Sequence, residues 1–256
     1  LAIGAGCGLV YEYLLSHYAG RVLGAVEVAI FGVITVMILF MGIGSFLARK
    51  VSNPYLGFAW LEVLLALFGS TTVLFIGGLF AFSELLPNIL MKTFSITQDL
   101  RPIGGFIAFA QAAVSYSPYV FGALLGTMIG MEIPLIGDIR ARIFNDQLKH
   151  NAGAIYGIDY IGAGFGAVLW LAFMLAMEIS LAAALTASVN LLIGIIFFIL
   201  FRREFKKPVA LIGAYFFTAI VIAQVYDKGA TWSAAMEDLL YRDRVMFRVN
   251  TDRQRL

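Results

Sequence analysis

The stretch Pro102–Met131, PIGGFIAFAQAAVSYSPYVFGALLGTMIGM, decides the fold class of this 256-residue chain. Its thirty residues carry no ionisable side chain other than two tyrosines. A helix needs about 20 predominantly apolar residues to cross a hydrocarbon core roughly 30 Å thick. Because backbone polar groups in lipid must be satisfied within the segment, a run of this length predicts a membrane-spanning helix.

Further apolar runs of similar length flank this stretch on both sides, so the pattern is repeated along the chain. With a first segment that Glu12 interrupts, they predict about seven spans, at roughly 1–18, 25–48, 55–86, 103–129, 155–177, 181–201 and 209–226. The predicted fold class is therefore all-α, a polytopic transmembrane helical bundle followed by the start of a soluble domain.

The composition agrees with a chain whose main partner is the lipid bilayer. Hydrophobic residues make up 61% of the chain and charged residues 13%, whereas soluble domains average about 25% charged. The net charge of +2 is too small to indicate a nucleic-acid partner. Cys7 is the single cysteine, which excludes an internal disulfide and a cysteine metal site, and we expect no metal centre.

The residues after Tyr226 differ in character from the spans. Residues 244–250 alternate between apolar and polar side chains, a period-two pattern that favours a β-strand. We therefore predict a transmembrane domain at 1–226, and a juxtamembrane helix with the first strand of a C-terminal domain at 227–256. We expect the remainder of that domain to lie beyond Leu256.

Regularly spaced glycines predict where helices meet. Glycines four residues apart form a smooth stripe on one helical face, which lets a neighbouring backbone approach closely. We expect packing within the bundle, or alternatively a dimer contact, at Gly122, Gly126, Gly130, Gly162 and Gly166.

Polar side chains inside the spans are the candidates for a binding site, because charge near a bilayer centre costs at least a few kcal/mol. One hypothesis is that four of them converge on a polar cavity that binds a cation: Glu12, Glu62, Gln111 and Asp159. The alternative is that each one caps a helix or lies near an interface, paired or protonated. Asn190 is a further polar residue at the centre of the sixth span.

The basic residues favour one orientation of the first six spans. Nine of them occupy alternate loops: Arg49, Lys50, Arg140, Arg142, Lys149, Arg202, Arg203, Lys206 and Lys207. The opposite loops hold Arg21, Lys92 and Arg101, joined by Lys228, Arg242 and Arg244 if the tail is counted. The positive-inside rule places the first group in the cytoplasm and the tail outside.

Several motifs together resemble a known family. Residues 5–12 (AGCGLVYE), 41–45 (MGIGS), 130–135 (GMEIPL) and 159–163 (DYIGA) resemble the membrane half of bacterial membrane-bound spermidine synthase-like proteins. Residues 240–245 (LYRDRV) and 250–254 (NTDRQ) resemble the first strand of polyamine aminopropyltransferases.

The resemblance implies a membrane-integrated aminopropyltransferase-like protein of the bacterial inner membrane. It implies decarboxylated S-adenosylmethionine as co-substrate, contacted by Gln254, with no cofactor and no catalytic residue in this chain. That donor is made in the cytoplasm, so this reading expects a cytoplasmic tail, against the charge count. Polyamine is an expected ligand, and a homo-oligomer or a membrane complex is the expected assembly. The alternative is a polyamine or cation transporter, or a scaffold or accessory subunit with a non-catalytic transferase-like domain.

Overall fold

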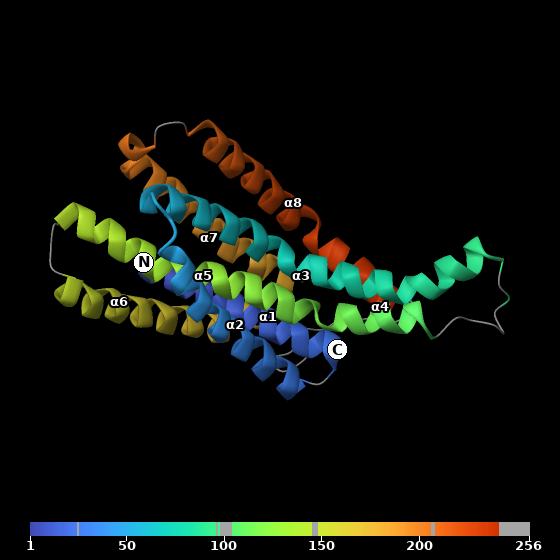
Figure 1. Ribbon diagram of the computed structural model, residues 1–256. Helices are drawn as coiled ribbons and strands as arrows, with labels where there is room; N and C mark the ends of the chain where they lie inside the picture. Colours follow the sequence, from blue (N-terminus) through green and yellow to red (C-terminus); the bar gives the residue numbers. More distant parts are fainter. Residues whose placement is uncertain (25, 96, 98–103, 145–147, 206–207, 241–256) are drawn as a thin grey trace.

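The computed structural model is a bundle of long helices (Figure 1). It describes residues 1–24, 26–95, 97, 104–144, 148–205 and 208–240. The regular elements within these ranges are all helical: α1 Ala2–Leu23, α2 Val26–Ala48, α3 Pro54–Thr93, α4 Phe106–Ser115, α5 Ser117–Phe144, α6 Leu148–Leu169, η2 Trp170–Met174, α7 Ile179–Leu200, η3 Arg202–Glu204 and α8 Val209–Leu240. The predicted all-α class is confirmed.

Six helical segments in this part of the chain are long and apolar enough to cross a membrane: Glu27–Ala48, Pro54–Thr93, Phe106–Phe144, Gly153–Met174, Ile179–Leu200 and Val209–Leu240. Helix α1, the first of the seven expected spans, is not among them. Glu12 and the polar residues near its end, Ser16, His17 and Arg21, lower its hydropathy. The fourth expected span is two helices, α4 and α5, which meet at Tyr116.

Local sequence signals explain where the helices begin and end. The Asn53 side chain accepts hydrogen bonds from the backbone N–H groups of Tyr55 and Leu56, and Pro54 occupies the first turn of α3. Glu178 caps α7 in the same way. Helix α1 ends at Gly24, whose φ of 72° is the left-handed conformation that a helix C-cap needs and glycine adopts most easily.

The glycine stripe of α5 lies against α2. A methyl group added at Gly126 would lie 2.5 Å from the carbonyl oxygen of Met37, and one at Gly130 would collide with the backbone of Met41. Gly122 faces the side chain of Met37 at a looser 3.3 Å. The Ser45 hydroxyl on α2 also donates a 2.9 Å hydrogen bond to the Gly130 carbonyl. These two helices therefore pack backbone to backbone.

A second glycine contact joins α6 to α1. Methyl groups at Gly162 and Gly166 would collide with the backbone at Ala2 and Gly6.

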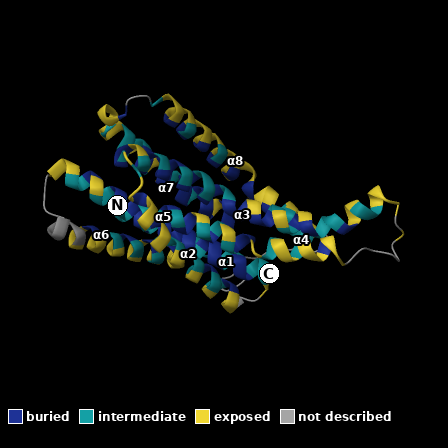
Figure 2. Ribbon diagram, in the orientation of Figure 1, coloured by how far each residue is buried: buried dark blue, intermediate teal, exposed yellow. Residues whose placement is uncertain are grey.

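Figure 2 shows buried residues where the central helices meet and exposed ones along the outer faces. The exposed faces include large apolar side chains such as Phe31, Phe165 and Phe216, each more than half accessible.

The helix ends next to the basic residues gather at one end of the bundle. The ends of α2, α5 and α7 and the starts of α3, α6 and α8 lie at the left of Figure 1, while the end of α3 and helix α4 extend to the right. Helix α8 begins at the left end and continues unbroken past Tyr226 to Leu240. Leu240, the last described residue, therefore lies away from the end of the bundle at which α8 starts. The strand predicted at 244–250 lies outside the described residues.

Candidate functional site

A buried polar cluster lies at the centre of the bundle, and Glu62 is its first member. Glu62 follows two apolar turns of α3, and its side chain is 0% exposed. The amide nitrogen of Asn190, on α7, donates a 3.0 Å hydrogen bond to Glu62 Oε2. Gly194, one turn further along α7, leaves room for Glu62 and Tyr215, since a methyl group there would lie 3.0 Å from Glu62 Cβ and from the Tyr215 hydroxyl.

The second carboxyl group comes from Glu132 on α5. Its side chain is 3% exposed, and it lies within hydrogen-bonding reach of the Glu62 carboxyl. Gly4 of α1 provides the space for it, because a methyl group at Gly4 would lie 2.8 Å from Glu132 Oε1. Two acidic side chains from helices far apart in sequence are thus brought together in the core.

Three polar atoms around this pair have no hydrogen-bond partner in the described part of the protein: Glu62 Oε1, Asn190 Oδ1 and Tyr11 Oη. The side chains of Tyr11 and Asn190 are each 1% exposed, so water does not reach them from outside. Buried polar groups are nearly always satisfied, and an orphaned acceptor costs about 1–3 kcal/mol. The cluster therefore has the chemistry of a site that a further donor would complete.

Within the described ranges, no cationic side chain pairs with either of the two carboxyl groups. Neither Glu62 nor Glu132 forms an ion pair with a lysine, arginine or histidine of the described residues. In the same ranges, no group of three or more His, Cys, Asp or Glu side chains is arranged to hold a metal ion. Two unpaired buried carboxylates in contact would be strongly unfavourable, so a proton or another single positive charge must accompany the pair.

Asp159 of α6 lies close to this cluster. Its negative charge acts on Glu132 electrostatically, and its own side chain is half-buried. It precedes Gly162, which packs against the first turn of α1, by one helical turn. Of the four polar residues singled out from the sequence, Glu62 and Asp159 are therefore neighbours of one buried acidic group, Glu132.

Glu12 is buried but occupies another part of α1. Its side chain is 8% exposed, and it has no hydrogen bond to Glu62, Gln111 or Asp159 in the described structure. Gly4 of α1 packs directly against the Glu132 carboxyl, and Glu12 follows Gly4 by eight positions, about 12 Å along the helix.

Gln111 has a different partner. On α4, its amide nitrogen donates a 3.3 Å hydrogen bond to Glu84 Oε1 on the distal part of α3. Glu84 and Glu62 belong to the same helix and are about 33 Å apart along its axis at 1.5 Å per residue. Gln111 therefore joins α4 to the end of α3 and is not part of the cluster around Glu62.

Comparison with curated proteins relates the whole chain to one kind of enzyme. A polyamine aminopropyltransferase of Shewanella oneidensis is 46% identical over 256 residues, which is 100% of this chain and 45% of that protein. Polyamine aminopropyltransferase 1 of Streptomyces coelicolor is 28% identical over 172 residues, 67% of this chain and 27% of that protein. This chain is a homologue of polyamine aminopropyltransferases. The resemblance seen in the sequence motifs is confirmed.

The homology covers only part of these relatives. Polyamine aminopropyltransferase 2 of Streptomyces coelicolor is 26% identical over 246 residues, 92% of this chain but 41% of that protein. The chain thus spans less than half the length of each of these relatives. No protein-family model and no solved structure matches it.

Sequence reasoning about this aminopropyltransferase homologue missed the central acidic pair. Glu132 was noted only within the motif GMEIPL, and Asn190 only as a polar residue in an apolar span. The sequence does carry a signal for Glu132, because this charged residue follows a long uncharged run in the same predicted helix. Gln254, the residue expected to contact the donor, lies outside the described residues.

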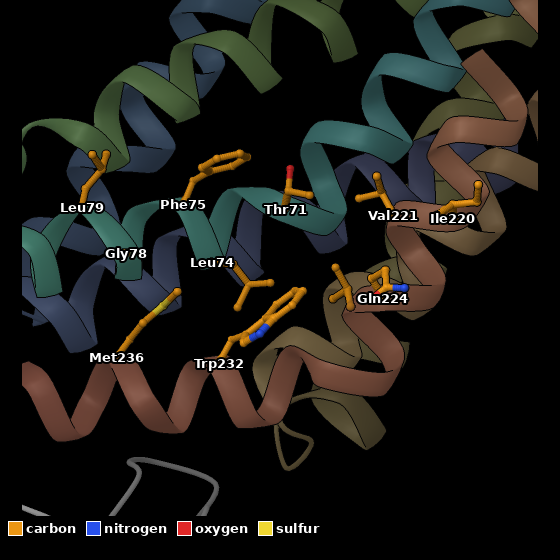
Figure 3. A pocket seen from close by; sticks show the side chains of 11 residues that line it. Thr71, Leu74, Phe75, Gly78, Leu79, Ile220, Val221, Gln224, Trp232 and Met236 are labelled. Carbon is orange, nitrogen blue, oxygen red and sulfur yellow. The ribbon is translucent and has the colours of Figure 1, made fainter. Parts of the chain in front are cut away.

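An apolar hollow of about 550 Å³ lies elsewhere, between α3 and α8 (Figure 3). Leu74 of α3 faces Trp232 of α8 across it, Met236 of α8 reaches toward Gly78 of α3, and Gln224 is a polar residue at its wall. None of its lining residues belongs to the acidic cluster, so its chemistry suits hydrocarbon rather than a cation.

Proposed function

We propose that this chain is the membrane-embedded part of an aminopropyltransferase-like enzyme of the bacterial inner membrane. The observation that carries the proposal is the 46% identity over the full chain to a curated polyamine aminopropyltransferase, of which the chain spans 45%. The enzyme would transfer an aminopropyl group from decarboxylated S-adenosylmethionine to a polyamine.

The surface of the bundle supports the membrane location. Six helical segments of the described chain are long and apolar enough to cross a bilayer, and their outer faces carry large apolar side chains. An exposed apolar surface of this extent would aggregate in water but is favourable against lipid tails. The lipid bilayer is therefore the first proposed partner.

The transferase chemistry belongs to residues beyond the helical bundle. Helix α8 ends at Leu240, and the segment resembling the first transferase strand, with Gln254, follows it. Aminopropyl transfer needs a deprotonated amine aligned with the carbon next to a sulfonium, so the donor and the acceptor must both be oriented. In this proposal, Gln254 helps to hold the nucleoside of the donor.

Activity of the full-length protein tests the proposal. The protein purified from washed membranes is incubated with decarboxylated S-adenosylmethionine and a series of diamines and polyamines, and methylthioadenosine is measured by mass spectrometry. We expect methylthioadenosine to form together with an aminopropylated amine. A well-folded preparation that forms neither product with any of the amines would overturn the proposal.

A pair of glutamine variants locates the donor contact. Gln254→Ala should lower kcat/KM for the donor about tenfold or more, because removing one hydrogen bond to a bound group costs roughly 1–2 kcal/mol. Gln224→Ala is the matched control, since Gln224 lies on α8 beside the apolar hollow, and its kinetics should match those of the unmodified protein. Equal kinetics for all three proteins would remove Gln254 from the site.

A cation or polyamine transporter is the second candidate function, and the buried acidic pair is the observation that favours it. Glu62, Glu132 and Asn190 lie about 12–18 Å along their helices from the helix ends nearest the basic loops, a depth that would fall within a hydrocarbon core about 30 Å thick. Ionisable residues at such depth mark ion pathways in many membrane proteins. Uptake of labelled polyamine into vesicles containing the full-length protein, lost in Glu62→Gln, would support transport.

A further inference from the structure

Two carboxyl groups within hydrogen-bonding reach need a donor between them. A carboxylate only accepts hydrogen bonds, so two ionised groups would oppose each other both in charge and in hydrogen bonding. Asn190 already donates to Glu62 Oε2, while Glu62 Oε1 has no donor among the described residues. A hydrogen atom on one of the two carboxyl groups would supply the missing donor.

We propose that Glu62 and Glu132 together form a proton-binding site in the core of the bundle, which holds one exchangeable proton between the two carboxyl groups. The site lies within the helices α3 and α5 and uses no residue of the tail. The proposal therefore does not depend on aminopropyl transfer.

The side chains that face the pair bring no positive charge, and the one positive group that acts electrostatically on both carboxyl groups is the amino group at Leu1. Helix α1 contributes Tyr11 and Cys7, α7 contributes Asn190, α8 contributes Tyr215, and α6 contributes Asp159. These side chains are neutral or acidic, and the Tyr215 hydroxyl is directed to the Ala59 carbonyl at 3.4 Å. The described surroundings thus hold no lysine, arginine or histidine to balance even one ionised carboxylate.

A proton fits this site better than a metal ion does. Ca²⁺ is bound by about six to eight oxygen atoms at roughly 2.3–2.6 Å and Mg²⁺ by about six at roughly 2.0–2.1 Å. The described residues include no group of three or more His, Cys, Asp or Glu side chains that could hold such an ion. Glu62 is fully buried, and Glu132 fits closely against Gly4. A proton needs no cavity and no ligand shell beyond the two oxygen atoms that share it.

Infrared spectroscopy tests the site directly, because a protonated carboxylic acid has a carbonyl stretch that is separate from the bands of carboxylates and amides. The full-length protein in lipid nanodiscs is measured at neutral pH in a buffer without alkali ions. We expect a carboxylic acid band that shifts on transfer to deuterium oxide. The band should be lost in the double variant Glu62→Gln, Glu132→Gln, and should persist in the matched buried control Glu12→Gln.

Several outcomes would overturn the proposal. One is a spectrum of the double variant that matches that of the unmodified protein. Another is loss of the band when sodium chloride is added, since the pair would then hold an alkali ion in place of the proton. If the double variant does not fold, the single variants decide: the proposal requires each of Glu62→Gln and Glu132→Gln to shift or remove the same band, and it fails if either leaves the band unchanged.

Discussion

Asn190 on α7 donates a 3.0 Å hydrogen bond to Glu62 on α3, and both side chains are almost completely buried. The two residues are 128 positions apart, so the bond links helices from the two halves of the chain. An amide donor to a carboxylate is a charge-assisted bond, or a neutral bond if Glu62 carries the shared proton. In either state the removal of Asn190 leaves the carboxyl group with one donor fewer.

Asn190→Ala should therefore lower the free energy of unfolding by about 1–3 kcal/mol, the cost of leaving a buried acceptor unsatisfied. Denaturant titration of the protein in detergent micelles measures the change. Gln111→Ala is the matched control, because Gln111 also donates an amide hydrogen bond to a carboxylate, Glu84, but at 3.3 Å and on a part-buried site. Gln111→Ala should lower the free energy of unfolding by less than about 1 kcal/mol. Equal effects of the two substitutions would show that burial does not strengthen the Asn190 bond.

The close packing of α2 and α5 gives a second prediction. Gly126→Ala places a methyl group 2.5 Å from the Met37 carbonyl oxygen, and the helices must move apart to accept it. Overpacking of this kind costs about 1–3 kcal/mol. We expect a lower free energy of unfolding, measured by the same titration.

Gly213→Ala is the control for this prediction. Gly213 is also in a helix, α8, but a methyl group there has no neighbour within 4 Å. Alanine favours helices over glycine by up to about 1 kcal/mol, so this substitution should be neutral or stabilising. If Gly126→Ala were equally neutral, the close approach of α2 and α5 would be wrong.

Much of the fold follows from the sequence because span length and hydropathy are local properties. A run such as Pro102–Met131 has few structural alternatives, whatever the rest of the chain does. The helix ends are less predictable, because polar residues at a helix terminus are compatible with either helix or loop. Helix α3 continues to Thr93 through Pro87, and α5 continues to Phe144 through Pro134, well beyond the apolar runs.

The composition of the site is harder to predict, since it depends on how the helices are arranged. Glu62 and Gln111 were equivalent as polar residues within apolar runs, yet Glu84, the hydrogen-bond partner of Gln111, is about 33 Å from Glu62 along α3. The pairing of Glu62 with Glu132 requires α3 and α5 to meet at one depth and on particular faces. Hydrophobic periodicity does not specify that rotation when a helix is apolar all round.

The cap of α3 gives a third prediction. Asn53 Oδ1 accepts the backbone N–H groups of Tyr55 and Leu56 at 3.1 and 3.3 Å. Asn53→Ala should lower the free energy of unfolding by about 0.5–2 kcal/mol, because those two donors lose their acceptor. Asn53→Asp keeps an oxygen acceptor and adds a favourable charge at the helix N-terminus, so its stability should be unchanged or higher. A loss of stability in both variants alike would argue against the capping role.

The side of the membrane on which the tail lies gives the last prediction. Helix α8 connects the end of the bundle with the basic loops to the end from which the chain continues past Leu240. The positive-inside rule would place the tail outside, whereas a donor made in the cytoplasm requires it inside. We predict a cytoplasmic tail, because the charge bias that opposes it falls to nine basic residues against six once the tail is counted.

Single cysteines just before α8 and near its C-terminal end distinguish these orientations in a Cys7→Ser background. Ala235 and Glu204 are exposed positions at opposite ends, whereas nearby Ser233 is 7% exposed and would resist labelling through burial alone. In intact cells, Ala235→Cys should resist an impermeant thiol reagent and Glu204→Cys should react with it, and both should react after the cells are opened. The reverse pattern would place the tail outside, away from the donor, and the transporter or scaffold would then be the better account of this chain.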